Sequence, residues 1–191
     1  MDRLLLHICC APDATVAFER LAVRFGATGF FYNPNIEPLS EYNLREAEAR
    51  LLASLWGVEY LEGEPNRKEW YDLAAPLCNE PERGERCRIC ISHRLEVTSR
   101  RAVELGYNSF ATTLTTSPHK DVDFIHEIGQ EIGKEHSLIY IPETFRLKDG
   151  FRRSVELARQ YSLYRQDYCG CRWSYANSHG RLPAIADMVV D

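Results

Sequence analysis

The sequence lacks the signature motifs of several common enzyme classes. It contains no phosphate loop of the G-x-x-x-x-G-K-[ST] or G-x-G-x-x-G type, and its six histidines form no H-x-x-H or H-E-x-x-H pattern. The use of a nucleoside triphosphate therefore has no motif support. No apolar run approaches the ~18–20 residues that a membrane span requires, and no apolar leader with a small-residue cleavage site opens the chain. We therefore expect a cytoplasmic protein without a membrane partner.

Positive charge is also in short supply. The 191 residues carry a formal net charge of −5, which argues against a surface covered with nucleic-acid-binding charge. The balance is uneven, because acidic residues dominate positions 37–85 whereas basic residues dominate positions 145–175. The basic stretch could hold phosphates, but an ordinary solvated helix face explains the charge equally well.

Cysteine, in contrast, is abundant. In a reducing compartment, seven cysteines argue for metal binding or catalysis rather than for disulfides, which would leave one of them over. Six of them form the pairs Cys9–Cys10, Cys87/Cys90 and Cys169/Cys171. Cys87 and Cys90 lie at a predicted helix start, where the helix dipole favours thiolates. Gly170 lets the backbone fold so that both sulfurs of the third pair face one way. Cys78 has no partner and is expected to be a bystander.

The first cysteine pair closes a predicted strand. The apolar run that begins at Leu4 is broken by Cys9-Cys10-Ala11-Pro12-Asp13, as a buried strand that enters a βα loop would be. Further strands predicted at 28–32, 58–61, 108–114 and 138–141 alternate with helical patterns at 14–25, 45–56, 87–105, 121–136 and 150–161. This alternation predicts an α/β protein with a Rossmann-like parallel sheet and helices on both faces. Residues 1–191 show no repeat or linker and are expected to form a single domain.

Ligands of open α/β sheets bind at the carboxyl ends of the strands, so we expect the three cysteine pairs to meet at one site. Four thiolates suit structural zinc, but thiolates equally hold iron–sulfur clusters. Six thiolates exceed the needs of one tetrahedral ion, which leaves a cluster with a second metal nearby, or zinc plus a redox-active cysteine pair. Asp13 is either a ligand or a cap of the next helix, and its spacing slightly favours the cap.

Other polar residues fall at the same predicted edge of the sheet. His7 lies within the first strand and is expected to be a satisfied core histidine rather than a ligand. His119 and Lys120 follow the fourth strand and could bind phosphate or donate protons, although an ordinary polar loop fits them nearly as well. Tyr32, Asn33 and Asn35 follow the second strand and could contact a base or sugar.

Several longer stretches occur in the order typical of one family. They are His7-Ile8-Cys9-Cys10-Ala11-Pro12, Phe31-Tyr32-Asn33-Pro34-Asn35-Ile36, Pro38-Leu39-Ser40-Glu41-Tyr42, Cys87–Cys90, Thr112-Thr113-Leu114 with Ser117-Pro118, and Tyr164-Arg165-Gln166 with Tyr168-Cys169-Gly170-Cys171. With these stretches the chain resembles the cobalamin-independent epoxyqueuosine reductases (QueH-type). The resemblance covers nearly the whole chain.

The resemblance implies a fold like that of the adenine nucleotide α-hydrolase or PP-loop-like proteins. It also implies a 4Fe–4S cluster beside a further metal ion, expected to be iron, held by the six paired cysteines. The implied reaction is the last step of queuosine synthesis, in which epoxyqueuosine in the tRNA anticodon loop loses its epoxide oxygen.

Removal of an epoxide oxygen requires two electrons, and a Lewis acid or proton for the departing oxygen. We therefore expect a low-potential electron donor as a partner, Asp13 on the mononuclear metal, and His119 or Lys120 as proton donors. For tRNA, an unpaired base is recognised by stacking and local phosphate contacts, and the basic stretch offers Arg152, Arg153 and Arg165 as candidates.

Two alternatives remain open from the residues. A PP-loop-type tRNA sulfurtransferase or ligase would use paired cysteines for sulfur relay, but it needs an S-G-G-x-D-S-type loop where this chain has Cys9-Cys10-Ala11-Pro12. A non-catalytic zinc-binding RNA module would bind zinc without iron or acid-labile sulfide. The excess of thiolates counts against this module.

Overall fold

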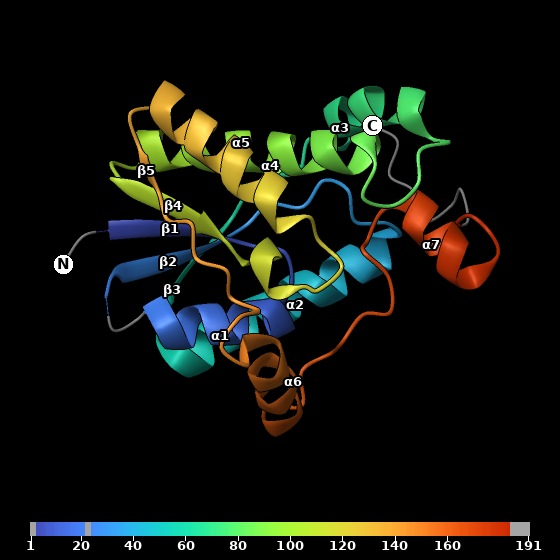
Figure 1. Ribbon diagram of the computed structural model, residues 1–191. Helices are drawn as coiled ribbons and strands as arrows, with labels where there is room; N and C mark the ends of the chain where they lie inside the picture. The colour runs from blue at the N-terminus through green and yellow to red at the C-terminus, as the bar shows by residue number, and fades with distance from the viewer. Residues whose placement is uncertain (1–2, 22–23, 184–191) are drawn as a thin grey trace.

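The computed structural model describes residues 3–21 and 24–183, and its centre is one parallel β-sheet (Figure 1). The five strands lie in the order β3-β2-β1-β4-β5, and every neighbouring pair is parallel. They span β1 (Arg3–Ile8), β2 (Gly26–Phe31), β3 (Glu59–Glu62), β4 (Ser109–Thr112) and β5 (Ile139–Tyr140). The predicted Rossmann-like parallel sheet is therefore confirmed.

The middle strand β1 is apolar because it is covered on both faces. From Leu4 to Ile8 every residue is buried, as expected for a central parallel strand between two helical layers. Leu4, Leu6 and Ile8 pack on one face of the sheet, and Leu5 packs on the other. His7, in the same strand, bonds Thr112 Oγ1 and the Tyr32 carbonyl at 2.9 and 3.1 Å, so the expected core histidine is confirmed.

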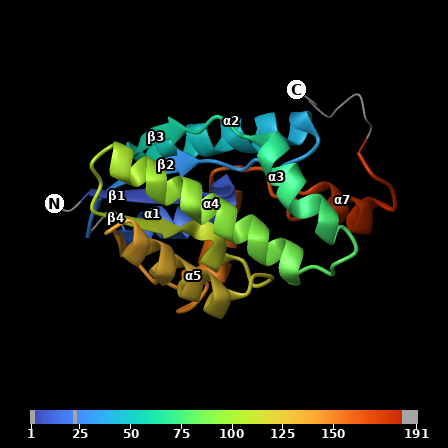
Figure 2. The same cartoon turned by 90° about the horizontal axis from the view of Figure 1, so that it is seen from above.

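Helices cover both faces of the sheet, as Figures 1 and 2 show. One layer holds α1 (Ala11–Leu21), α2 (Leu39–Trp56) and α6 (Gly150–Gln160), and the other holds α4 (Glu85–Glu104) and α5 (Val122–Glu135). Two shorter helices, α3 (Arg67–Ala74) and α7 (Arg172–His179), lie beyond the carboxyl ends of the strands (Figure 1). Two 3₁₀ turns, η1 (Ala75–Leu77) and η2 (Thr113–Thr116), complete the described elements.

The ends of the helices and strands can be compared with the boundaries predicted from the sequence. The first helix begins at Ala11 rather than at position 14. Pro12 is tolerated in its first turn because backbone N–H groups have no partner within the helix there, and proline has no N–H to leave unpaired. The expected stop at Gly57 is confirmed, since this residue adopts the left-handed conformation with φ 63°. The end of the fourth predicted strand is instead η2, where Leu114 N–H bonds the Thr112 hydroxyl. Among the helices of residues 3–21 and 24–183, none has the length and apolarity needed to cross a bilayer.

Candidate metal centre and substrate pocket

The strand order places a site between β1 and β4. The chain runs from β1 outward to β2 and β3 and then returns to β4 on the other side of β1, so the two carboxyl ends flank a topological switch point. Cys9 follows β1 and Thr113 follows β4. The Cys9 backbone N–H donates to Thr113 Oγ1 at 3.1 Å, and this hydroxyl lies 3.2 Å from Cys9 Sγ. The switch point therefore fixes the first cysteine directly.

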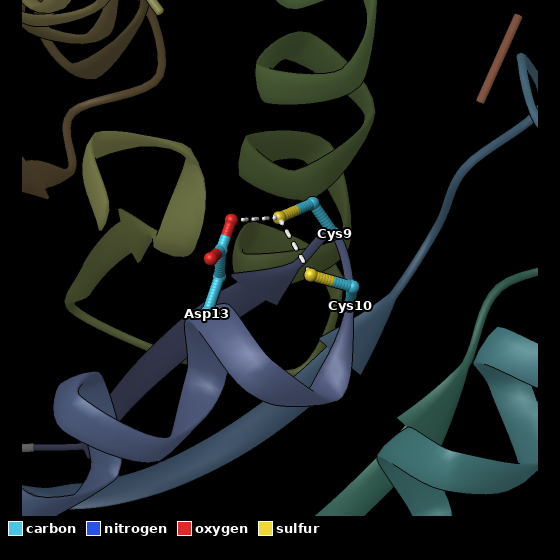
Figure 3. A group of neighbouring side chains, drawn as sticks. All are labelled: Cys9, Cys10 and Asp13. Atoms are coloured by element: carbon cyan, nitrogen blue, oxygen red, sulfur yellow. Dashed lines mark hydrogen bonds between the residues drawn. The ribbon is translucent and has the colours of Figure 1, made fainter. Parts of the chain in front are cut away.

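Cys9, Cys10 and Asp13 form one compact set of ligand atoms, which we call the Cys9 group (Figure 3). Their sulfur and carboxylate atoms lie within 4.8 Å of one another. Cys9 Sγ is 3.9 Å from Cys10 Sγ and 3.5 Å from Asp13 Oδ2. Asp13 is in the first turn of α1, and its side chain contacts the thiol; the slight preference for a helix cap therefore finds no support in the contacts described for this carboxylate.

Two members of the Cys9 group, Cys9 and Asp13, have raised pKa values. The hydrogen bond to Cys10 and burial both raise the pKa of the Cys9 thiol. Burial also raises the pKa of the Asp13 carboxyl, although the bond from Cys9 and the charges of Arg165 and Lys120 oppose it. A thiol and a carboxyl that lie in contact and both disfavour negative charge are an arrangement that a bound cation would relieve.

The other four paired cysteines line a second, smaller cavity, which we call the four-thiol cavity. Cys90 and Cys171 pack together with Trp70 and Ala74 in a buried cluster. Burial raises the pKa of Cys87 and raises that of Cys171 to about 12, and in both cases the neighbouring thiols add to the effect. The cavity is lined by Cys87, Cys90, Cys169, Cys171, Asn35, Trp70, Arg86, Ile91, Arg94 and Lys120.

Two distant segments bring these four thiols together. Cys87 and Cys90 lie in the first turns of α4, and the Arg83 backbone N–H donates to Cys87 Sγ at 3.3 Å. Cys171 is the N-cap of α7, where its side chain accepts from Ser174 N–H. Between the cysteines of this second pair, Gly170 has φ 128°, a conformation that a residue with a Cβ rarely adopts.

A buried arginine fixes the Cys169–Cys171 segment. The Arg45 guanidinium, 2% exposed, donates to the Tyr168 and Cys169 carbonyls at 3.1 and 3.0 Å and pairs with Glu41 at 2.6 Å. A Cβ at Gly170 would lie only 3.2 Å from the same guanidinium. The glycine is thus required both by its backbone conformation and by the close approach of Arg45.

Cys169 differs from the other cysteines because cations surround it. Lys120 Nζ donates to Cys169 Sγ at 2.8 Å. Burial opposes ionisation, but Lys120 and Arg94 outweigh it and hold the pKa of Cys169 below its ordinary value. Arg94 is buried and lies near Cys90, Cys169 and Cys9, so one guanidinium compensates thiolates of both sites. The two sites are therefore electrostatic neighbours.

Unpartnered polar atoms test whether these cavities fit a bound group. Seven buried side-chain N or O atoms lack a hydrogen-bond partner within residues 3–21 and 24–183, and three of them belong to residues of the four-thiol cavity. They are Trp70 Nε1, Arg86 Nε and Asn35 Oδ1. A buried N–H left without an acceptor costs about 1–3 kcal/mol, so two such donors beside four thiols fit a bound group that accepts hydrogen bonds.

Beside both sites lies a larger open pocket of about 310 Å³. Cys9, Asp13 and Cys169 all line it, so it reaches both the Cys9 group and the four-thiol cavity. Of the residues predicted from the sequence, the pocket lining contains Asp13, Asn33, Asn35, His119, Lys120 and Arg165. Asn33 is fixed by bonds to the Ile8 carbonyl and Arg94, at 2.8 and 3.2 Å.

The open pocket also presents acceptors that have no donor. Asn35 Oδ1 and Gln166 Oε1 line it and have no partner among the described residues, while Gln166 Nε2 lies 3.1 Å from Cys10 Sγ. These carbonyl oxygens suit a ligand with N–H or O–H groups. The pocket is about the size at which small ligands begin to be enclosed.

Some predicted residues lie elsewhere. Tyr32 is buried and its hydroxyl bonds His93, and it does not line the open pocket. Arg152 and Arg153 are on α6 and pair with neighbouring acids, Arg153 with Glu19 at 2.7 Å. Their roles in substrate binding stay predictions. Cys78 is exposed and unpaired in the described chain, as expected of a bystander.

Sequence reasoning missed several residues that shape the site. Arg86 lies within an ordinary helical pattern, although a basic residue directly beside Cys87 is a signal. Trp70 carried no signal at all, because nothing in the sequence links α3 to the cysteine pairs. Gln166 and Arg45 become significant only once the fold brings them to Cys10 and Cys169.

Comparison with known proteins identifies the family. The family model for "Epoxyqueuosine reductase QueH" matches residues 4–177. The epoxyqueuosine reductase QueH of Streptococcus pyogenes is 39% identical over 174 residues, which cover 88% of this chain and 68% of that protein. The protein of the same name from Thermotoga maritima is 36% identical over 178 residues, which cover 91% of each chain.

Solved structures bear on the fold. A predicted subunit of tRNA methyltransferase from Methanocaldococcus jannaschii superposes with a TM-score of 0.62 at 14% identity, over 100% of this chain and 93% of that one. The U34-tRNA thiolase NcsA from Methanococcus maripaludis, solved with its [4Fe-4S] cluster, gives a TM-score of 0.52 at 15% identity, over 87% of this chain and 58% of that one. These superpositions show that the α/β fold of this chain also occurs in both proteins. By its family match and its relatives, the chain belongs to the epoxyqueuosine reductase QueH family, which is a family of oxidoreductases.

Proposed function

We propose that this chain, acting as a single domain over residues 1–191, reduces epoxyqueuosine in the anticodon loop of tRNA to queuosine. The observation that carries the proposal is the open pocket, which Cys9, Asp13 and Cys169 all line. In the balanced reaction the epoxide takes up two electrons and two protons, both C–O bonds break, a C=C bond forms and water leaves. Family membership favours this reaction over the sulfurtransferase and zinc-module alternatives.

Two metal centres suit the donor sets. We assign Cys87, Cys90, Cys169 and Cys171 to a 4Fe–4S cluster, since thiolates are its ordinary ligands and the N–H groups of Trp70 and Arg86 there lack acceptors. We assign Cys9, Cys10 and Asp13 to a separate metal ion, for which iron suits the mixture of two sulfurs and a carboxylate oxygen. When bound, the cluster would supply electrons singly, and the ion would supply a Lewis acid for the epoxide oxygen.

The residues of the chain bind and orient the modified nucleoside. Asn35 Oδ1 and Gln166 Oε1 accept hydrogen bonds from its N–H and O–H groups, because both oxygens lack partners within the described chain. Asn33 is held by Ile8 and Arg94 and so presents a fixed edge to the pocket. Arg165, a lining residue near Asp13, binds phosphate or the nucleoside itself.

Protons come from the loop that follows β4. Lys120 Nζ lies between Cys169 and the pocket and holds a positive charge there, because the thiolate of Cys169 raises its pKa despite burial. This charge stabilises an oxygen that becomes negative as its C–O bond breaks. His119 is exposed beside it at the pocket, where it can pass protons from solvent. We assign both residues to catalysis with Asp13.

The tRNA approaches the open pocket with its anticodon loop. Its modified base leaves the stack to enter, which is the usual route for chemistry on a single base. Arg152 and Arg153 on α6 would meet phosphates farther from the reacting base, and their pairing with Glu19 and Asp149 must then open. A low-potential electron donor in the cytoplasm completes the system.

Anaerobic reconstitution tests the proposal. The purified chain is reconstituted with iron and sulfide, its iron and acid-labile sulfide are measured, and it is mixed with epoxyqueuosine-tRNA and a low-potential reductant. We expect about four sulfides with more than four irons per chain, and conversion of the nucleoside to queuosine. One zinc with no sulfide, or a loaded protein that leaves epoxyqueuosine unchanged, would refute it. The exposed Cys78→Ala variant should behave as the wild type.

A further inference from the structure

Trp70 and Arg86 have N–H groups that no atom of the described chain satisfies. Trp70 Nε1 and Arg86 Nε are both buried, their residues being 1% and 2% exposed. Both residues line the four-thiol cavity. We propose that these two N–H groups donate hydrogen bonds to sulfur atoms of the group held in that cavity, and that they raise its reduction potential. This inference rests on the proposed function.

Trp70 is held in place by packing rather than by its polar atom. It lies on α3 and belongs to the same buried cluster as Cys90 and Cys171. Its ring is 5.6 Å from that of Trp173, the second residue after Cys171. An indole N–H is a donor only, so a side chain in this position can serve a bound group solely by donating to it.

Arg86 connects the two cysteine segments. Its Nη1 donates to the carbonyls of Leu77, Cys78 and Glu80 at 3.1, 2.9 and 2.6 Å, which ties the preceding loop to α4. Its guanidinium also lies 5.0 Å from the centre of the Trp173 ring on α7. With one face on Trp173 and one nitrogen used by the loop, Nε is left as a fixed donor beside Cys87.

The physical effect follows from charge. Reduction adds an electron to a centre that thiolates already make negative, and an N–H donor stabilises the more negative state. Each donor therefore favours the reduced form, and its removal lowers the reduction potential. Arg86 adds a full positive charge to its N–H, so its effect should exceed that of Trp70. The two residues position and tune the centre and do not contact the substrate pocket.

A matched pair of tryptophan variants tests the inference. Trp70→Phe keeps an aromatic ring against Trp173 and removes only the N–H and part of the ring. Trp56→Phe is the control, because Trp56 Nε1 is also buried and unpartnered but packs against Phe18 and Tyr161 in the core of the other layer. The measurement is a redox titration of the reconstituted protein, followed by electron paramagnetic resonance at equal iron and sulfide content.

At a fixed solution potential we expect Trp70→Phe to lower the ratio of reduced to oxidised cluster about tenfold, which for one electron equals about 59 mV. Trp56→Phe should leave the ratio unchanged. An unchanged ratio in Trp70→Phe at wild-type iron and sulfide content would overturn the inference alone. Wild-type chain that takes up no sulfide would overturn both the inference and the proposed function.

A second measurement begins with the wild-type protein. In wild-type protein with ¹⁵N in the tryptophan indoles, the reduced cluster should show a hyperfine coupling to one indole nitrogen. The coupling should persist in Trp56→Phe and vanish in Trp70→Phe. Its absence from the wild type would show that no indole N–H reaches the centre and would overturn the assignment to Trp70. Arg86→Met, which removes both the charge and the Nε–H, should lower the potential further than Trp70→Phe, and an equal or higher potential at wild-type iron and sulfide content would remove Arg86 from the proposal.

Discussion

The Cys9 group and the four-thiol cavity both contain cysteine thiols, but they differ in how they are built and in what surrounds them. The Cys9 group is local, since its three ligands lie within five residues of one another at a single βα turn, and it opens into the larger pocket. The four-thiol cavity joins two segments about 80 residues apart and is closed by Trp70 and packed against Trp173. The first has a carboxylate and unpartnered acceptors nearby; the second has unpartnered donors.

This contrast matches the two tasks of a reductive deoxygenation. A centre that stores electrons benefits from enclosure and from N–H donors, because both control its potential. A centre that receives an oxygen atom must face the substrate, and a hard carboxylate ligand suits such an ion. Arg94, which is close to thiolates of both sites, places them within one electrostatic field. Variants at each site can test this contrast separately.

The largest effect is expected from single ligand losses compared across the two sites. Cys90→Ala should remove nearly all acid-labile sulfide, whereas Cys10→Ala should keep the sulfide and lose about one iron. Both should cut the reaction rate more than about 100-fold, since loss of a supporting partner alone costs 10–100-fold. Iron and sulfide analysis with the tRNA assay gives the readout. If Cys10→Ala lost all sulfide as well, the two sites would not be independent.

The carboxylate provides the next comparison. Asp13→Asn should weaken the separate ion about 10–100-fold while leaving the sulfide content at the wild-type level. The reason is that the amide keeps the shape and loses the charge that holds a cation beside Cys9 and Cys10. Competition with a chelator measures the affinity. Glu19→Gln, in the same helix but outside the site, is the matched control. If both variants retained the ion equally well, Asp13 would not be a ligand of the ion.

Substrate binding should divide the arginines into two kinds. Arg165→Ala should weaken binding of epoxyqueuosine-tRNA several-fold more than binding of tRNA with an unmodified guanosine, because Arg165 lines the open pocket. Arg152→Ala with Arg153→Ala should weaken both tRNAs alike and flatten the salt dependence by a slope of about 1.4, at about 0.7 per phosphate contact. An unchanged slope of the salt dependence would show that α6 does not contact the phosphates of the tRNA.

Much of this architecture could be predicted from the sequence, for identifiable reasons. The strand that ends at Cys9, the buried His7 and the stop at Gly57 depend on local patterns, namely an apolar run, a strand position and a glycine at a helix end. The Cys9 group needed only the rule that ligands gather at strand ends. These features involve residues near one another in the chain.

The rest depended on contacts that the chain does not encode locally. Which cysteines share a cavity is decided by where α7 returns to α4, and Cys169 owes its low pKa to Lys120, 49 residues away. Trp70 reaches the four-thiol cavity through a third element, α3. Charge counting along the sequence also suggested Arg152 and Arg153, but it could not reveal that acids on α1 and α6 already pair with them.

The smallest effect should come from a titrating residue outside both sites. His126 on α5 has ring nitrogens 3.1 Å from Tyr140 Oη and 2.8 Å from Thr144 Oγ1, and burial lowers its pKa below the usual 6.5. The folded chain thus keeps His126 neutral while the unfolded chain protonates first as the pH falls. Its contribution to the free energy of unfolding is complete above about pH 6.5 and is lost below it, towards the lowered pKa.

His126→Gln should therefore show a shallower loss of stability than the wild type between pH 7 and pH 5. The difference should stay below about 1 kcal/mol, because the ring is half-buried and solvent screens its charge. Anaerobic denaturant unfolding at pH 5, 6 and 7 measures it, with iron and sulfide determined at each pH. Parallel pH profiles would contradict the assignment, and a loss of iron or sulfide confined to His126→Gln would mean that α5 supports the metal sites after all.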